Sequence, residues 1–244
     1  MISVVVPAYN EEELLRETVK NVVQSADAAG SVTIEIIIVN DGSRDRTGPI
    51  IAELEKAYPC VRGIHHAENS GLGVCIKDAL AQAKYAKFMI VPGDNDMSPD
   101  LITNLFRNYD KADLILAYFI NKEDRGRLRN VISTLYGLVY MCVFNVFIQY
   151  INSPCIYPTE KIRGFHIRSK RFSVVAELTI KCLRSGCTFH EISGYMQTGV
   201  EGSSSLGLKS FLDVVSTFLK LVKEIKLSHN LDFNKKPVRI NPAA

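Results

Sequence analysis

The chain has 244 residues, of which 47% are hydrophobic and 23% charged, and it contains no Trp. This composition excludes a collagen, a long coiled coil and a wholly disordered protein, and a chain of this length buries roughly 70% or more of its unfolded surface. The net charge of +3 hides an asymmetry, because residues 1–122 carry 12 basic and 17 acidic side chains whereas residues 123–244 carry 17 and 9. Either this is accidental surface charge, or the second half meets an anion such as a phosphate, a lipid headgroup or a nucleic acid.

The N-terminal segment and the cysteines indicate the compartment. The segment MISVVVP has neither the basic region nor the cleavage site of a signal peptide, so we expect a cytosolic chain, or one at the cytosolic face of a membrane. The six cysteines form no CxxC pair, which predicts reduced thiols and no zinc site. Weak periodicity in residues 228–244 predicts a flexible C-terminal tail.

The first 120 residues alternate between short β-branched runs and stretches of helical periodicity. The predicted strands are Ile2–Val6, Glu35–Val39, Val61–His65, Lys87–Val91 and Asp113–Phe119. The predicted helices begin at Glu11, with Asn10 as N-cap, and continue with Pro49–Tyr58, Val74–Ala86 and Asp100–Tyr109. The alternation predicts a mostly parallel sheet with helices on both faces, and ligands that bind at the carboxyl ends of its strands.

The second half is less regular. We expect helices at Ser173–Arg184, with Ser173 as N-cap, and at Ser210–Leu227, with the strand Thr188–Ile192 between them. The 21 residues Val131–Ile151 carry no charge and are long enough to span a membrane. A span would separate the two halves of a shared site. We therefore expect a helix that lies on the membrane or lines an acceptor groove, with a buried core helix as the alternative.

Polar loops follow four of the predicted strands. They are Pro7–Glu11, Asn40–Asp45, Asn69–Gly73 and Gly93–Asp96. Asp94 and Asp96 can share a hard divalent cation, although a D-x-D sequence is also typical of a solvated turn. Asp41 can accept hydrogen bonds from a base or a ribose. The dinucleotide fingerprint G-x-G-x-x-G is not completed, because Ile76 stands at its last position, and this argues against an NAD site.

Together and in this order, the segments SVVVPAYNEEE, EIIIVNDGSRDRT, NSGLG and GDND resemble the nucleotide-sugar-binding half of a family 2 glycosyltransferase with a GT-A fold. The chain is most similar to polyprenyl-phosphate sugar transferases of the dolichol-phosphate mannose synthase type. In these an arginine-rich segment and an apolar helix follow the metal loop, here Arg125–Ile151. Three further features follow in the chain. They are a Gly-Phe pair that opens a short strand (Arg163–Phe165), a helix with an acidic residue (Glu177) and a Gly/Ser-rich loop (Glu201–Ser205).

The resemblance implies a single Rossmann-like α/β domain of the GT-A type over residues 1–227, with a nucleotide-sugar-binding half (1–120) and an acceptor half (121–227). It also implies which residues contact the nucleotide: Pro7, Tyr9, Glu11, Asp41, Asp94 and Asn95. Asp94 and Asp96 would hold Mg²⁺ or Mn²⁺ beside the diphosphate, with Asp96 as the chief ligand and a catalytic residue. The expected acceptor or phosphate contacts are Arg125, Arg127, Arg129, Arg163, Ser203 and Lys209.

Three positions depart from the family pattern. Asn40 stands where an acidic residue is frequent, and Ser98 lies in the region of the Gln that often follows the metal loop. Residues 198–200, Thr-Gly-Val, lack the Arg that usually precedes the Gly/Ser-rich loop. These departures leave the donor, the importance of the metal and the acceptor subgroup open.

The expected reaction is an inverting transfer of a sugar from a nucleotide-diphosphate sugar, in which a divalent cation stabilises the leaving diphosphate. The first candidate acceptor is a polyprenyl or dolichyl phosphate at the membrane surface, which needs little help from a base because a phosphate monoester is mostly dianionic at pH 7. A saccharide hydroxyl would require a base, for which Glu177 is the candidate, although Glu177 also fits an ion pair with Lys181.

Two other classes of protein stay open: a nucleotidyltransferase and a catalytically degenerate nucleotide-sugar-binding protein. The chain lacks the Gly-rich phosphate loop expected of the first, and its pair of aspartates argues against the second. We expect peripheral contact with a membrane and no binding of nucleic acid, and a homo-oligomer is compatible with the sequence.

Overall fold

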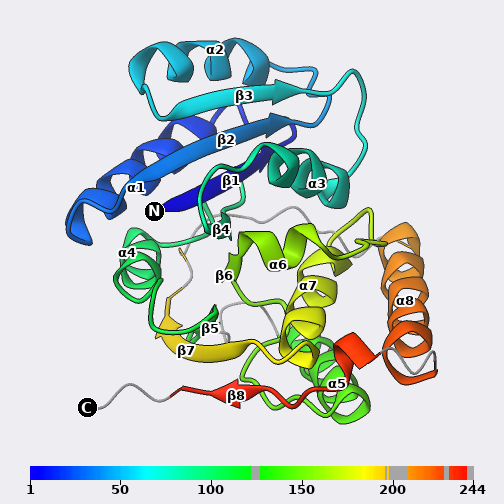
Figure 1. The fold of residues 1–244 in the computed structure, drawn as a ribbon. Helices are drawn as coiled ribbons and strands as arrows, with labels where there is room; N and C mark the ends of the chain where they lie inside the picture. Colours follow the sequence, from blue (N-terminus) through cyan, green and yellow to red (C-terminus); the bar gives the residue numbers. More distant parts are fainter. Residues whose placement is uncertain (122–126, 196, 198–207, 228–230, 241–244) are drawn as a thin grey trace.

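The computed structural model describes residues 1–121, 127–195, 197, 208–227 and 231–240, with the backbone alone described for 127–130, 208–211 and 231. Its centre is a sheet of eight strands in the order β3-β2-β1-β4-β6-β5-β7-β8 (Figure 1). The strands are β1 (Ile2–Ala8), β2 (Ile34–Asn40), β3 (Val61–His65), β4 (Lys87–Ile90), β5 (Leu114–Phe119), β6 (Cys155–Pro158), β7 (Thr188–Gly194) and β8 (Val238–Arg239). All neighbours pair in parallel except β6, which is antiparallel to β4 and β5, so the prediction of a mostly parallel sheet is confirmed.

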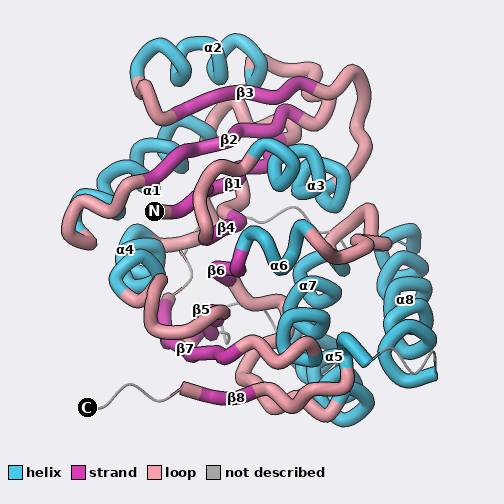
Figure 2. The backbone as a smooth tube through the Cα atoms, in the orientation of Figure 1, coloured by secondary structure: helices cyan, strands magenta, loops and turns pink. Residues whose placement is uncertain are grey.

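Helices cover both faces of the sheet (Figure 2). They are α1 (Leu15–Ala28), α2 (Thr47–Ala57), α3 (Leu72–Gln82), α4 (Pro99–Arg107), α5 (Arg127–Phe144), α6 (Thr159–Arg163), α7 (Ser173–Arg184) and α8 (Leu208–Val222), which a π-helical turn (Lys223–Leu227) extends. Successive strand residues point to opposite faces. Val4 and Val6 therefore pack in the core below α1, α2 and α4, whereas Val5 packs in the core below α3, α5, α7 and α8.

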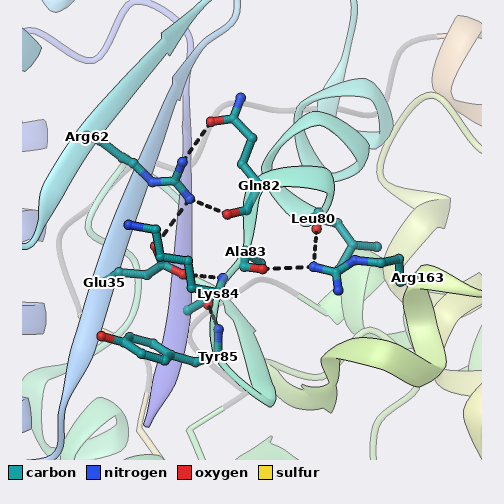
Figure 3. A network of polar contacts seen from close by, with 9 residues as sticks. Glu35, Arg62, Leu80, Gln82, Ala83, Lys84, Tyr85 and Arg163 are labelled. Carbon is teal, nitrogen blue, oxygen red and sulfur yellow. Dashed lines mark hydrogen bonds and ion pairs between the residues drawn. The ribbon is translucent and has the colours of Figure 1, made fainter.

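Two predicted helix ends are wrong for the same reason. At both ends, backbone N–H groups donate to side chains from other parts of the chain instead of to helical carbonyl groups. The helix expected at Glu11 begins at Leu15, and Asn10 is not its N-cap. Asn10 has a φ of 58°, and the N–H of Glu11 donates to Thr47 Oγ1 at 2.8 Å. The α3 helix ends at Gln82 rather than at residue 86, since the next free N–H groups are taken by buried side chains. Lys84 N, for example, donates to Glu35 Oε1 at 2.6 Å (Figure 3).

The second half departs further from the predicted elements. The helix α5 ends at Phe144, and residues 145–151 are not helical. Among the described residues, no helix is long and apolar enough to span a membrane. The short strand β6 was not predicted, whereas Arg163–Phe165 forms the end of α6 and a turn instead of a strand. Ser173 is the first residue of α7, and Phe172 is its N-cap.

The C-terminal segment is only partly what the sequence predicts. Within residues 231–240, Phe233 is buried, Lys235 N donates to Arg184 O at 3.0 Å, and β8 pairs with β7. These contacts correct the expectation of a flexible tail for this stretch. The rest of the predicted tail, residues 228–230 and 241–244, lies outside the described residues.

Candidate active site

The site forms where β1, β2 and β4 end side by side at the carboxyl edge of the sheet. The backbone joins these ends directly, because Asp41 N donates to Ala8 O at 2.9 Å and Gly93 N donates to Pro7 O at 3.1 Å. Three of the four predicted polar loops are thereby brought together around the end of β1. Pro7 is half-buried there, and the neighbouring Tyr9 side chain is 44% exposed.

The loop after β1 is cross-linked to the loop after β2. Asn10 N donates to Ser43 Oγ at 3.0 Å, and Arg44 N donates to Asn10 Oδ1 at 2.9 Å. Glu12 N in turn donates to Asp45 Oδ2 at 3.1 Å. Side-chain bonds of this kind fix loops that have no ladder of their own. An open hollow of about 440 Å³ is lined by Asn10–Leu14 and Arg44–Asp45.

Glu11 and Asp94 form the acidic part of the site. A Cβ placed on Gly93 would lie 3.4 Å from Glu11 Cγ, which shows how closely the two loops approach. Burial raises the pKa of Glu11 to about 7, and the negative charges of Asp94 and Asp45 contribute to the rise. Clustered carboxylates with excess negative charge are the oxygen donors that Mg²⁺ and Mn²⁺ prefer. The residues present therefore fit the divalent cation that the sequence predicts.

The turn that carries Asp94 and Asp96 depends on Asn95. Asn95 adopts a φ of 56°, and its buried Oδ1 accepts from Asn21 Nδ2 of α1 at 2.9 Å. This contact gives Asn95 a structural part in shaping the turn. The nucleotide contact expected of Asn95 stays a prediction. Gln197 N donates to Asp96 O at 3.0 Å and ties the segment after β7 to the turn, a contact that the sequence did not predict.

Asp41 anchors the loop between β3 and α3. Its Oδ1 accepts from Ser70 N at 2.8 Å and bonds His66 Nδ1 at 2.9 Å, while its Oδ2 accepts from Gly71 N at 2.8 Å. Burial would raise the pKa of Asp41, but the bonds from His66, Ser70 and Gly71 hold it below its ordinary value. The predicted contact of Asp41 with a base or ribose stays a prediction.

Sequence reasoning missed His66 and Cys75, which lie beside Asp41. One ligand atom from each of the three lies within 4.8 Å of the others. His66 bridges two carboxylates, since its Nε2 also bonds Asp78 Oδ2 at 3.0 Å. Burial, with Asp41 nearby, raises the pKa of Cys75 to about 12, which keeps it a thiol. Because a metal needs the thiolate and Asp41 is already bonded to backbone N–H groups, the donor atoms of this cluster are poorly available to a cation.

Glu177, the candidate base, lies inside the protein. Both its oxygens accept from backbone N–H groups of Arg168 and Ser169 at 2.8–3.0 Å, and Lys181 Nζ lies 2.9 Å from its Oε1. The ion pair that the sequence offered as the alternative is therefore present. Both side chains are 0% exposed. A base must reach the acceptor hydroxyl, so this burial favours the ion pair, and a catalytic role for Glu177 stays a prediction.

Arg163, expected to bind the acceptor, lies at the end of α3. Its Nη2 donates to Leu80 O at 3.0 Å and to Ala83 O at 2.8 Å (Figure 3). Its Nη1 pairs with Glu160. The guanidinium thus caps a helix, and the expected acceptor contact of Arg163 stays a prediction. Other predicted acceptor contacts lie outside the described residues or side chains: Arg125, Arg127, Arg129, Ser203 and Lys209.

The sequence profile of glycosyl transferase family 2 matches residues 3–179. A similar curated protein is dolichyl-phosphate beta-glucosyltransferase ALG5D of Trichomonas vaginalis, 28% identical over 148 residues that cover 56% of this chain and 45% of that protein. Probable glycosyltransferase YdaM of Bacillus subtilis is 33% identical over 141 residues, 50% of this chain and 33% of that protein. The chain thus spans less than half the length of these relatives.

Solved structures share the fold. Glucosyl-3-phosphoglycerate synthase from Mycobacterium tuberculosis, in complex with Mn²⁺, UDP and phosphoglyceric acid, superposes with a TM-score of 0.63 at 18% identity, over 90% of this chain and 78% of that one. TarS 1-349 of S. aureus in complex with UDP-GlcNAc gives a TM-score of 0.59 at 16% identity, over 91% and 66%. The family profile covers most of the sequence and the sheet has the arrangement of these enzymes: the chain belongs to glycosyl transferase family 2 and has the GT-A fold.

Proposed function

We propose that this protein is an inverting glycosyltransferase that moves a sugar from a nucleotide-diphosphate sugar to an acceptor. The observation that carries the proposal is the joined edge of β1, β2 and β4, where Glu11 lies close to Asp94 and Asp41 directly follows β2. The M. tuberculosis synthase binds UDP and Mn²⁺ on the same fold, which supports the same kind of ligands here.

In the proposed reaction the residues of this chain bind and orient the donor. The loops that Asp41 and Asn10 hold together bind the base and ribose, and the exposed ring of Tyr9 offers a surface for stacking. Asp94 and Asp96 hold a divalent cation beside the diphosphate, with Glu11 next to them. When bound, that cation neutralises the negative charge that develops on the leaving group. Fixed loops reduce the reorganisation needed to reach the transition state.

The acceptor we propose is a polyprenyl or dolichyl phosphate. The similarity to a dolichyl-phosphate beta-glucosyltransferase supports this class of acceptor. A lipid acceptor also requires an apolar surface, and the described part of α5 and α8 offers one. Its exposed side chains are Val131, Ile132, Leu135, Leu138, Val139, Leu212, Val215 and Leu219. The nearby Phe147 is 72% exposed.

We propose that this surface lies on the cytosolic face of a membrane. Three exposed lysines, Lys220, Lys223 and Lys226, lie in the last turn of α8 and in the π-helical turn that extends it. Lysines near an apolar face bind anionic lipid headgroups. Flotation with phosphatidylserine vesicles should recover the protein at low salt, and Leu135→Gln/Leu219→Gln should reduce the recovery. Val238→Gln, which changes an exposed apolar residue on β8, is the control. Equal recovery of all three proteins, or none, would refute the membrane contact.

A panel of nucleotide sugars tests the reaction itself. Each is incubated with Mn²⁺ or Mg²⁺ and either farnesyl phosphate or a soluble saccharide, and transfer is measured. We expect transfer to the phosphate, at least 100-fold slower in Asp96→Ala and unchanged in Asp100→Asn, which alters an exposed residue of α4. Transfer to the saccharide alone would show that the acceptor is a saccharide hydroxyl and not a lipid phosphate. Full activity of Asp96→Ala would refute the proposed role of Asp96.

A further inference from the structure

The loop before α7, residues 166–172, lies directly against the loop that begins α3 (Figure 1). Gly73 N donates to Lys170 O at 3.0 Å. A Cβ on Gly73 would collide with the carbonyl oxygen of Ser169, and one on Gly71 would collide with that of Lys170. The two backbones therefore touch without side chains between them, which only glycine allows.

Two buried carboxylates fix this contact from either side. Asp41 holds the α3 loop through the N–H groups of Ser70 and Gly71. Glu177 holds the other loop through the N–H groups of Arg168 and Ser169. Asp41 lies at the end of β2, so the second loop is attached to the carboxyl edge where the nucleotide site is proposed.

The second loop carries three exposed basic side chains: Arg168, Lys170 and Arg171. Arg168 Nε donates to Glu224 Oε2 at 2.9 Å, so this charge has a partner. Lys170 and Arg171 form no ion pair with any residue in the described ranges. A Cβ on Gly71 would lie 3.9 Å from Arg171 Cγ, so the Arg171 side chain begins beside the loop that Asp41 holds.

We propose that Lys170 and Arg171 bind a phosphate group of the reactants, an inference that rests on the proposed transferase function. The guanidinium of arginine matches phosphate oxygens in a two-pronged bond, and the lysine ammonium adds a second charge. Unlike Arg163, whose guanidinium is bonded at the end of α3, these two side chains form no ion pair within the described residues. The phosphate belongs either to the diphosphate of the donor or to the monophosphate of the acceptor.

Binding titrations of Lys170→Gln/Arg171→Gln test this assignment. The control, Lys56→Gln/Lys111→Gln, removes the same charge from exposed positions that precede β3 and β5, at the opposite edge of the sheet. The probes are UDP with Mn²⁺, uridine, and farnesyl phosphate, all at one salt concentration. We expect the affinity for at least one phosphate probe to fall about tenfold or more, with uridine binding unchanged and thermal unfolding as in the control.

The pattern of affected probes identifies the phosphate. Weaker binding of UDP supports the assignment and names the donor diphosphate as the source, whereas weaker binding of farnesyl phosphate names the acceptor. Affinities for both phosphate probes that match the control would overturn the inference while leaving the proposed function intact. A wild-type protein that binds neither phosphate probe would overturn both.

Discussion

Replacing Lys181 by Met removes the charge at the centre of a buried ionic cluster. Lys181 Nζ lies 2.9 Å from Glu177 Oε1 and 3.0 Å from Glu224 Oε1, and it donates to His166 O at 2.7 Å. The Lys181 and Glu177 side chains are 0% exposed, and that of Glu224 is 14% exposed. The substitution leaves two carboxylates buried together without their shared cation.

Breaking a buried ion pair by removing one partner costs about 3–5 kcal/mol. In a domain of this size each 1 kcal/mol lowers Tm by about 2–4 °C, so Lys181→Met should lower Tm by roughly 6–20 °C. The free energy of unfolding of a folded protein is about 5–15 kcal/mol, so the variant should still fold but should lose a large part of that free energy. The additional change Glu224→Gln should recover part of the loss, because it removes one of the two carboxylate charges that shared the lysine while its amide oxygen can still accept from Arg168 Nε.

Urea unfolding followed by circular dichroism measures these free energies. The control is Arg16→Met, which breaks a surface pair whose side chains are 49% and 54% exposed and should cost about 0–1 kcal/mol. A Lys181→Met protein as stable as the Arg16→Met control would contradict this expectation. So would a Lys181→Met/Glu224→Gln protein less stable than Lys181→Met.

Three further predictions concern the loops and helix ends. Gly73→Ala should cost about 1–3 kcal/mol in urea unfolding and weaken UDP binding, because its Cβ meets a backbone carbonyl, whereas Gly137→Ala in α5 meets only a methyl carbon at 4.0 Å and should not destabilise. Arg163→Met should lower stability by about 1–2 kcal/mol and leave farnesyl phosphate binding unchanged; weaker binding would restore its acceptor role. Asp41 has a pKa below its ordinary 3.8, so the stability it adds is present above about pH 4 and is lost as pH falls through the lower folded value. The gap in unfolding free energy between wild type and Asp41→Asn should shrink over that range, and a constant gap would contradict this.

The sequence predicts best what depends on neighbours along the chain. The polar turns at Asp41 and Asp94 could be located because each follows a β-branched run, and the Glu177–Lys181 pair could be offered because the residues are one helical turn apart. The pair's burial could not be predicted, since it depends on Glu224 and on the 166–172 loop. The capping bonds of Arg163 could not be predicted, because Leu80 and Ala83 lie about 80 residues earlier in the chain.

Other residues were missed because nothing near them in the sequence marks them. His66 is one of five histidines, and only the fold places it between Asp41 and Asp78. In the sequence, Lys170 and Arg171 cannot be told from other charged surface residues. Only the structure shows that Gly71 and Gly73 allow their loop to lie against the sheet edge. The two-residue strand β8 is too short to give any periodic signal.

We propose that the carboxyl edge of β1, β2 and β4 binds a nucleotide diphosphate through a divalent cation held by Asp94 and Asp96. Calorimetric titration of UDP into the wild-type protein, with and without Mn²⁺, and into Asp94→Asn/Asp96→Asn measures this binding. We expect binding that requires Mn²⁺ and is weakened at least 100-fold in the variant, with an unchanged Tm in the absence of metal. UDP affinity that is the same with and without Mn²⁺, or the same in the variant, would contradict the claim.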